Sequence, residues 1–329
     1  MNDPGAASRA APQGPLLPGR LRAGARIGVV APASPTADRT RAQRGNAALE
    51  RLGYTVELRV DPLRHHGYYA GTDPERATAL VAALTDDDLD AVLCLRGGEG
   101  CMRTLLALPD RAVDRIRDAR PKPLIGYSDI TILHAWLQAE IGWVGFSGPM
   151  LTSFAEATPY TVEGFQRALA APAPFTVAAP SDGPQMRTVV PGRAEGRLAG
   201  GCLSLVQALV GTPWQPDLDG ALLCVEDIGE PPRRIDQMLT QLLAAGLLDR
   251  LAGVLVGELV DCNPGVRGDA YPHSLSIEQV LDELLAPLGV PVLSGLPIGH
   301  GLHLATLPMG IQAELDADAG VLRVQPAVT

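Results

Sequence analysis

The first half of the chain alternates short apolar runs with segments in which apolar residues recur every three or four positions. Apolar runs between turn residues predict buried strands, and the second spacing predicts helices. Asp73 is expected to cap the second helix, with Pro74 in its first turn. Because strands alternate with helices, this half predicts a parallel sheet with helices on both faces. The expected strands cover residues 26–32, 55–60, 90–96, 124–127 and 143–146, and the expected helices cover residues 38–52, 73–84 and 130–140.

The second half, from about residue 192, predicts a mixture of strands and helices. Gly246 is expected to end a helix, because the apolar residues before it share one helical face. That face comprises Ile235, Met238, Leu239, Leu242 and Leu243. Further helices are expected over residues 203–210 and 277–285. Strands are expected over residues 221–225, 251–259 and 290–296, followed by a closing hairpin over 311–315 and 321–324.

The length of 329 residues is typical of about two domains. Residues 1–22, rich in Ala, Pro, Gly and Arg, are expected to form a disordered tail. An N-terminal domain is expected over 23–170 and a C-terminal domain over 192–329. Residues 171–191, rich in Pro and Ala and without helical periodicity, are expected to be the linker.

Composition and charge narrow the class of protein. Hydrophobic residues make up 46% of the chain and the formal net charge is −10, so sizeable cores are possible and a nucleic-acid partner is not expected. Five cysteines without a CxxC pair are expected to be buried thiols, which weakly favours a reducing compartment. No apolar run approaches the roughly 18 residues needed to span a bilayer, so no membrane partner is expected.

The segment around Ser128 carries the first candidate for chemistry. Residues 123–131 read as a short strand, a tight turn and the start of a helix, which would place Ser128 above the carboxyl end of a parallel sheet. A serine hydroxyl needs a base to act as a nucleophile at neutral pH. Gly126-x-Ser128-x-Ile130 resembles the nucleophile elbow of α/β-hydrolases but lacks its second glycine.

A base and an acid can be chosen from the ends of later strands. His300 is the best base of the six histidines, because glycines on both sides would let a turn present its ring to a cleft, although a surface loop histidine has about equal weight. Glu226 follows an apolar strand and could orient that base; alternatively, Glu226 or Asp227 caps the next turn. The order Ser128, Glu226, His300 matches nucleophile, acid and base in α/β-hydrolases and places the site in an interdomain cleft.

Two backbone amides are candidates for an oxyanion hole. Gly98 lies in the glycine-rich run after a strand, and Asp129 lies at a helix start. Such a run also suits phosphates, but it matches neither GxGxxG nor the Walker pattern. Arg96 could pair with a substrate carboxylate in bidentate fashion, or could tie two loops together.

Eight sequence blocks, in order over roughly residues 25–325, are together much more specific than any single motif. They are IGVVAPAS (27–34), GYYAGTD (67–73), LRGG (95–98), PKPLIGYSD (121–129), SGPM (147–150), GGCL (200–203), VED (225–227) and GLPIGH (295–300). In these blocks the chain resembles the LD-carboxypeptidases (muramoyltetrapeptide carboxypeptidases), a family of serine peptidases that also contains the microcin C immunity proteins.

The resemblance implies a Ser128–Glu226–His300 triad and an oxyanion hole from the amides near Gly98 and at Asp129. It implies a flavodoxin-like, parallel-sheet N-terminal domain, a smaller β-rich α/β C-terminal domain, no metal or cofactor, and a cytoplasmic homodimer. The implied reaction hydrolyses the L,D amide bond that releases terminal D-Ala from murein tetrapeptide during peptidoglycan recycling.

Several positions depart from the family pattern. The family often has Tyr, His and Asn where this chain has Glu99, Ser147 and Cys202, and Arg234 and Gln237 replace a Tyr and an Arg. Arg96, Glu99 and Ser147 are therefore candidates for substrate binding. Glu99 would add negative charge near the nucleophile and so disfavour a carboxylate or favour a cation.

Two other functions are left open. The first is a related amidase of the immunity type, acting on aminoacyl or peptidyl sulfamoyl adenylates, for which Trp214 is the candidate to stack a base, although a core tryptophan is the better interpretation. The second is a non-catalytic binding protein that uses the same cleft.

Overall fold

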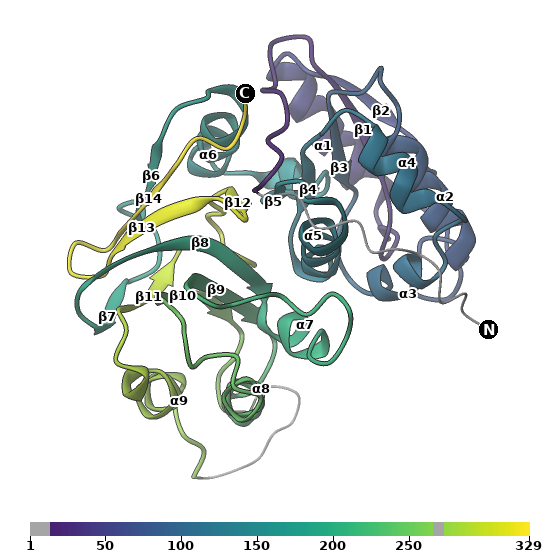
Figure 1. The fold of residues 1–329 in the computed structure, drawn as a ribbon. Helices are drawn as coiled ribbons and strands as arrows, with labels where there is room; N and C mark the ends of the chain where they lie inside the picture. Colours follow the sequence, from purple (N-terminus) through teal and green to yellow (C-terminus); the bar gives the residue numbers. More distant parts are fainter. Residues whose placement is uncertain (1–13, 266–272) are drawn as a thin grey trace.

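The chain folds into two α/β domains, each built on its own sheet (Figure 1). The structure, a computed structural model, describes residues 14–265 and 273–329. The first sheet has the strand order β12-β5-β4-β3-β1-β2, and the second has the order β6-β14-β13-β8-β9-β10-β11-β7.

The first sheet has the strand order of a flavodoxin-like fold. Its parallel strands are β1 (Arg26–Val30), β2 (Thr55–Leu58), β3 (Ala91–Cys94), β4 (Leu124–Gly126) and β5 (Gly145–Ser147). The order reverses between β1 and β3, and ligands commonly bind beyond the carboxyl ends of strands at such a reversal. The parallel sheet and the flavodoxin-like domain predicted above are confirmed.

The helices of the first domain follow its strands along the chain. They are α1 (Arg39–Arg51), α2 (Asp73–Leu84), α3 (Cys101–Leu106), α4 (Ala112–Asp118), α5 (Thr131–Trp136) and α6 (Pro159–Ala170). Shorter helical turns cover η1 (Ser128–Ile130), η2 (Leu137–Ile141) and η3 (Ser153–Glu156). The sequence pattern did not predict α3, α4 or α6.

The N-cap of α2 differs from the prediction. Thr72, not Asp73, is the N-cap residue, because it is extended and its backbone amide donates to Glu75 in a capping box. The Asp73 carboxylate instead accepts hydrogen bonds from the guanidinium groups of Arg76 and Arg103. Pro74 lies in the first turn as predicted.

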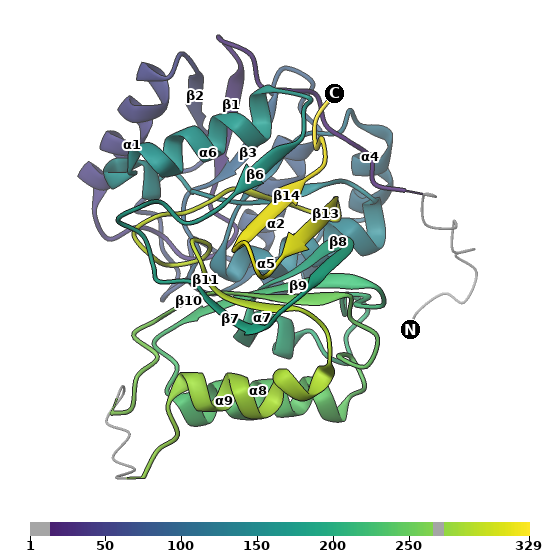
Figure 2. The same ribbon diagram turned by 90° about the vertical axis from the view of Figure 1, so that its left-hand side faces the viewer.

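The central strands of the second sheet, β9 and β10, are buried on both faces. The sheet consists of β6 (Phe175–Val177), β7 (Arg187–Val190), β8 (Arg193–Cys202), β9 (Ala221–Ile228), β10 (Gly253–Val260), β11 (Val292–Leu296), β13 (Gln312–Asp316) and β14 (Val321–Val324). The helices of this half are α7 (Leu203–Ala208), α8 (Pro232–Ala244), α9 (Ile277–Leu284) and η5 (Ala286–Leu288). Along β9, Leu223 and Val225 belong to the core cluster that also holds α8 and α9, whereas Leu222 and Cys224 belong to the cluster shared with the first domain. Figure 2 shows α8 and α9 on one side of this sheet and the first domain on the other.

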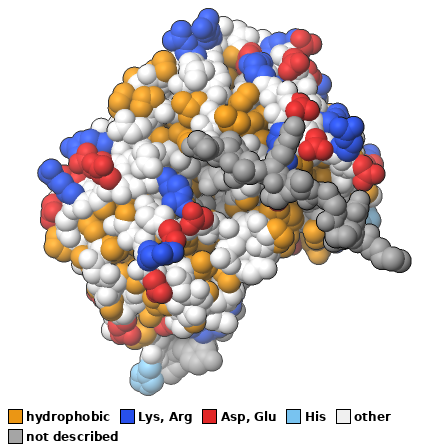
Figure 3. Space-filling view, viewed as in Figure 1, with side chains coloured by type: hydrophobic (Ala, Val, Ile, Leu, Met, Phe, Trp, Pro, Cys, Tyr) orange, Lys and Arg blue, Asp and Glu red, His pale blue; other side chains and the backbone are white. Residues whose placement is uncertain are grey.

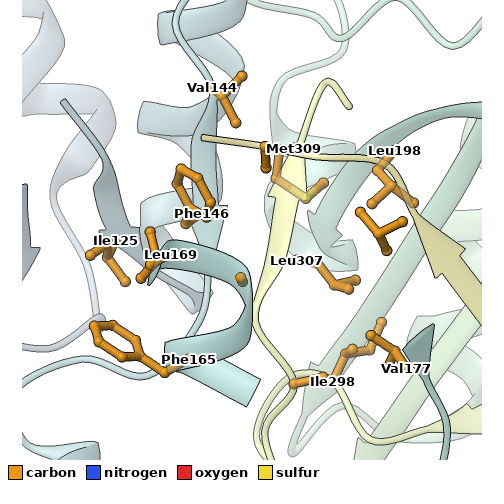
Figure 4. Packing of buried hydrophobic residues seen from close by; sticks show 14 of the residues in the cluster. Ile125, Val144, Phe146, Phe165, Leu169, Val177, Leu198, Ile298, Leu307 and Met309 are labelled. Carbon is orange, nitrogen blue, oxygen red and sulfur yellow. The ribbon is translucent and has the colours of Figure 1, made fainter. Parts of the chain in front are cut away.

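The two domains share one hydrophobic core. The strand β12 (Leu307–Met309) comes late in the chain, yet it pairs antiparallel with β5 at the edge of the first sheet. Leu307 and Met309 lie between Phe146 of the first sheet and Leu198 of the second (Figure 4). The domains are therefore held together by apolar packing and by β12, a strand from the second half of the chain that pairs with the first sheet.

The predicted linker and tail need correction. Residues 171–191 contain β6 and β7, which form the two edges of the second sheet, so this segment contributes to the C-terminal sheet. Residues 1–13 lie outside the described residues, but part of 14–22 is bound to the folded domain: the Leu16 amide donates to the Gly142 carbonyl at 2.7 Å and Leu21 is buried. Their backbone partners and one buried leucine offset the ordering entropy that the Pro- and Gly-rich composition would otherwise oppose.

The surface and the described helices add little to the functional assignment. On the face in Figure 3, basic and acidic side chains are interspersed, with no continuous basic stripe. None of the described helices has both the length and the apolar character needed to cross a membrane. All five cysteines are buried free thiols, as predicted.

A buried histidine behind the Ser128 turn makes stability depend on pH. Burial lowers the pKa of His134 to about 4, and its Nε2 contacts the Leu124 carbonyl at 3.2 Å. The unfolded chain has an ordinary histidine pKa of about 6.5 and binds the proton more readily, so stability is lost as the pH falls from 6.5 toward 4. Between pH 7 and 4.5, we expect the wild type to lose about 2 kcal/mol more unfolding free energy than His134→Gln. Urea unfolding at several pH values measures this, and identical pH slopes would contradict a neutral buried His134.

Candidate active site

Ser128 sits in a strained turn at the carboxyl end of β4. Tyr127 is extended, and Ser128, the first residue of η1, adopts a left-handed conformation with φ +64°. This conformation is costly for a residue with a Cβ and is typical of nucleophile elbows, where it exposes the hydroxyl above the sheet.

Two glycines make room for this turn. A Cβ at Gly126 would lie 2.8 Å from Ile130 Cγ1, and a Cβ at Gly97 would lie 2.7 Å from Ser128 Cβ. Ile130 occupies the position of the second glycine in the GxSxG pattern, and its buried side chain packs against Gly126. The missing glycine therefore does not prevent the elbow from forming.

Glu226 and His300 form a hydrogen-bonded pair at the domain interface. Glu226 Oε2 lies 2.7 Å from His300 Nδ1. Gly299 has φ +95°, and a Cβ there would lie 2.2 Å from the same carboxylate oxygen, so a glycine is required for this approach. Because side chains alternate along β9, Glu226 lies on the sheet face shared with the first domain, with Leu222 and Cys224.

The neighbouring acid has a different role. The Asp227 carboxylate accepts a hydrogen bond from the Ser204 amide at 2.8 Å, in the first turn of α7. Asp227 therefore takes the capping role, whereas Glu226 is left for the histidine. Burial raises the pKa of Glu226, and the hydrogen bond and charge of His300 oppose that rise. The contact with His300 therefore helps to keep the buried Glu226 carboxyl ionised.

The nucleophile and the histidine line one cavity between the domains. This cavity, of about 200 Å³, is lined by Ser128 and His300 together with Arg96, Gly98 and Tyr127. The Tyr127 ring meets the His300 ring edge-on, with centroids 4.9 Å apart. Within the described residues no hydrogen bond joins Ser128 to His300; such contacts often tighten only when substrate binds.

The glycine-rich loop that lies against Ser128 is held in place by Ser34. The Ser34 amide donates to the Gly97 carbonyl, and Ser34 Oγ accepts from the Glu99 amide at 3.1 Å. Gly98 has φ +109° and lines the cavity. Asp129 is buried, which raises its pKa, and its carboxylate accepts from the Cys101 amide at 2.8 Å. The side chain of Asp129 thus fixes α3 to the elbow, a role that the sequence pattern did not predict.

The predicted substrate-binding residues fall in different places. Arg96 lines the cavity and donates only to the Pro35 carbonyl at 3.4 Å within the described chain, so its guanidinium has no carboxylate partner. Glu99 lines an adjoining cavity instead. Ser147 ends β5, beside Gly126 and Leu307, and is not among the residues that line the cavity.

The other positions that depart from the family pattern lie behind or beside the site. Cys202 is buried opposite Glu226 in the β8–β9 register. Arg234 and Gln237 bind each other on α8. Trp214 is half-buried and packs against the core of the first domain, which supports the interpretation as a core residue.

The sequence pattern missed several residues that line the cavity. Arg41 and Thr36 enter it from α1 and from the loop before α1, and Tyr127 enters from the elbow itself. Their sequence signal is only their position after the carboxyl end of a predicted strand, where site residues gather in parallel sheets. Within the described residues, no cluster of three or more His, Cys, Asp or Glu side chains is arranged to hold a metal ion.

Comparisons with known families assign the chain. The LD-carboxypeptidase N-terminal domain model matches residues 27–148, and the C-terminal domain model matches residues 195–315. The chain is 41% identical to a putative carboxypeptidase of Streptomyces coelicolor, covering 95% of this chain and 97% of that protein. It is 38% identical to a probable murein peptide carboxypeptidase of Bacillus subtilis, covering 91% of each.

Solved structures agree with these matches. A muramoyltetrapeptide carboxypeptidase from Oxalobacter formigenes is 31% identical with a TM-score of 0.79, covering 92% of this chain and 100% of that one. MccF in complex with glutamyl sulfamoyl guanosine has a TM-score of 0.86 at 24% identity, covering 96% and 100%, which shows a common fold. Fold and sequence thus define a two-domain α/β peptidase. The chain belongs to the LD-carboxypeptidase family.

The strain at Ser128 can be measured by substitution. Ala and Gly both remove the hydroxyl, but only Gly adopts the left-handed conformation without a Cβ clash. We expect Ser128→Gly to have an unfolding free energy about 1 kcal/mol higher than Ser128→Ala. Chemical denaturation of the two variants tests this, and a glycine variant that is no more stable would argue against a strained elbow.

Proposed function

We propose that the protein is a serine carboxypeptidase that releases terminal D-Ala from murein tetrapeptide by hydrolysing its L,D amide bond. The observation that carries this proposal is the His300–Glu226 pair, which shares one interdomain cavity with a left-handed Ser128. Relatives named as murein peptide and muramoyltetrapeptide carboxypeptidases support the substrate.

The contacts at the site support a role for each atom of the proposed triad. His300 Nδ1 contacts the Glu226 carboxylate, so Nδ1 carries the ring proton and Nε2 is left as the base. Nε2 removes the proton from Ser128 Oγ, which attacks the scissile carbonyl carbon. The buried Glu226 carboxylate then stabilises the imidazolium that forms.

Two backbone amides are proposed to stabilise the negative charge on the carbonyl oxygen. The Gly98 amide has no acceptor within the described part of the chain and lies in a loop that Ser34 fixes in place. The Asp129 amide lies at the start of the helical turn after the nucleophile, where partial positive charge favours an anion. Arg96 has no carboxylate partner and is positioned to bind a carboxylate of the substrate.

Product release completes the cycle. Collapse of the tetrahedral intermediate breaks the C–N bond, and the His300 imidazolium gives its proton to the leaving amine of D-Ala. Water then attacks the acyl-enzyme ester with His300 again as base, which releases the shortened peptide and restores Ser128.

The family resemblance also leads us to propose a cytoplasmic location and a homodimer. Sedimentation at several protein concentrations would test the homodimer.

The acid of the triad provides a sharp test. Glu226→Gln keeps the size of the side chain but removes the carboxylate that accepts the Nδ1–H hydrogen bond. His300 is then no longer held in the tautomer with Nε2 free, and its imidazolium has no negative partner. We expect kcat for D-Ala release to fall about 10³- to 10⁴-fold, and Ser128→Ala to fall at least as far, with unchanged circular dichroism. Near-normal D-Ala release by either folded variant would exclude the proposed triad.

The same assay separates the carboxypeptidase from the immunity-type amidase. MccF, whose structure contains a glutamyl sulfamoyl guanosine, shares the fold, so aminoacyl sulfamoyl adenosine should be assayed beside the tetrapeptide. Trp214 packs against the core of the first domain and is not among the residues that line the Ser128 cavity. Turnover of the nucleoside compound without turnover of the tetrapeptide would favour the amidase.

The close contact at Gly97 predicts a second loss of activity. Gly97→Ala would place a Cβ 2.7 Å from Ser128 Cβ and displace the nucleophile. We expect kcat/KM to fall about a hundredfold, because small misplacements of a reacting group have effects of this size. Gly164→Ala in α6 is the matched control, since its added Cβ would meet nothing closer than 3.8 Å and should leave activity unchanged. Full activity of the Gly97 variant would contradict this close approach.

A further inference from the structure

A second cavity adjoins the one that holds Ser128. It measures about 680 Å³ and shares Thr36, Arg96 and Gly98 with the first. It lies beyond the carboxyl ends of β1 and β3, where the order of the parallel strands reverses. Crevices at such reversals are the usual ligand sites of open parallel sheets, and the mechanism above uses only the first cavity.

One wall of this second cavity is an aromatic ring held in place from behind. Tyr68 is 61% exposed, and its ring packs against Tyr69 with centroids 4.4 Å apart. The Tyr69 ring is itself flanked by the guanidinium groups of Arg76 and Arg103, at 4.6 and 4.9 Å from its centroid. Both arginines are bound to Asp73. Tyr68 is therefore an exposed aromatic wall whose position is fixed before any ligand arrives.

The second cavity also contains an acidic side chain that makes no ion pair within the described chain, and its basic lining residues are Arg96 and His65. The acid, Glu99, is exposed and lines this cavity but not the first. Its backbone is fixed, because its amide donates to Ser34 Oγ at 3.1 Å. Leu63 and Pro35 supply apolar surface in the same cavity. A carboxylate, an aromatic ring and apolar surface together suit an ammonium group on an aliphatic chain.

We propose that this cavity binds the cationic side chain of the peptide residue whose carbonyl Ser128 attacks, through Glu99 and the face of Tyr68. This rests on the proposed carboxypeptidase function and names the substrate side chain that the site selects. Gly98, the proposed oxyanion donor, borders both cavities. The side chain next to the attacked carbonyl is therefore the first substituent that can reach the second cavity. Glu99 is then a residue that determines specificity.

Two peptides that differ by one amino group test the proposal. In the tetrapeptide L-Ala-γ-D-Glu-X-D-Ala, X is L-lysine in one peptide and norleucine, which lacks the amine, in the other. For the wild type, we expect kcat/KM to be roughly fivefold to tenfold higher with lysine, the size typical of one exposed ion pair with a cation–π contact.

Variants assign this preference to the cavity. Glu99→Gln should bring the lysine-to-norleucine ratio close to one by lowering the lysine rate, and Glu99→Asp should retain most of the preference. Tyr68→Leu should lower the lysine rate more than the norleucine rate. Glu163→Gln, an exposed acid on α6 outside the cavity, is the matched control and should behave like the wild type. An unchanged ratio in folded Glu99→Gln overturns the proposal.

Binding separates failure of this proposal from failure of the proposed function. Titration calorimetry of both peptides into Ser128→Ala measures the ratio of dissociation constants without turnover. Tighter binding of the lysine peptide, lost on adding Glu99→Gln, supports the cavity even if the wild type cleaves neither peptide, a result that would contradict only the carboxypeptidase. Equal affinities for the two peptides, or no binding of either, would overturn the cationic site. Weaker binding of aminoacyl sulfamoyl adenosine to the Tyr68→Leu variant would also overturn it, because Tyr68 would then stack a nucleoside base.

Discussion

The candidate site depends on the apolar interface between the two domains. Ser128 and the glycine loop belong to the first sheet, whereas Glu226 and His300 belong to the second half of the chain. Their relative position is set by one continuous core and by β12, which leaves the second half to pair with β5. His300 lies only a few residues before β12, so the pairing of β12 with β5 also anchors the histidine loop.

Within that frame, close backbone approach is the recurring local constraint. Gly97 lies against Ser128, and Gly299 lies against Glu226, in both cases at distances that a Cβ would not permit. Ser128 itself is strained, because it has a Cβ and still adopts a left-handed conformation. The core on either side supplies the packing energy that holds this strained turn in place.

The electrostatics of the site follow from the same packing. Burial raises the pKa of Glu226, and the imidazole beside it opposes this rise. Further out, the charged groups face solvent, and Arg96 and Glu99 make no ion pair with one another or with other described residues. The buried charge of Glu226 is thus paired within the site, whereas Arg96 and Glu99 along the two cavities are available to bind a ligand.

Local patterns determined much of the fold. The predicted bounds of α2 match those observed, and the hairpin of β13 and β14 was predicted nearly in full, because both depend on short-range periodicity and turn signals. The long strand β8 escaped prediction because Gly196, Gly200 and Gly201 interrupt its apolar pattern; at Gly200 a Cβ would lie 2.2 Å from the Cys224 carbonyl oxygen. β12 contains a proline and is only three residues long, so nothing local marks it as a strand of the other domain.

The sequence by itself determined the kinds of groups that meet at the site: a serine after a strand, an acid after another strand and a histidine between glycines. Strand position alone left Glu226 and Asp227 open, and the tertiary structure separates them, because pleating turns one toward His300 and the other toward α7. The tertiary structure also decided that Glu99 faces a second cavity and that Ser147 does not line the first. Residue type and spacing describe what a side chain can do, but the direction in which it points depends on strand register and on packing between segments far apart in the chain.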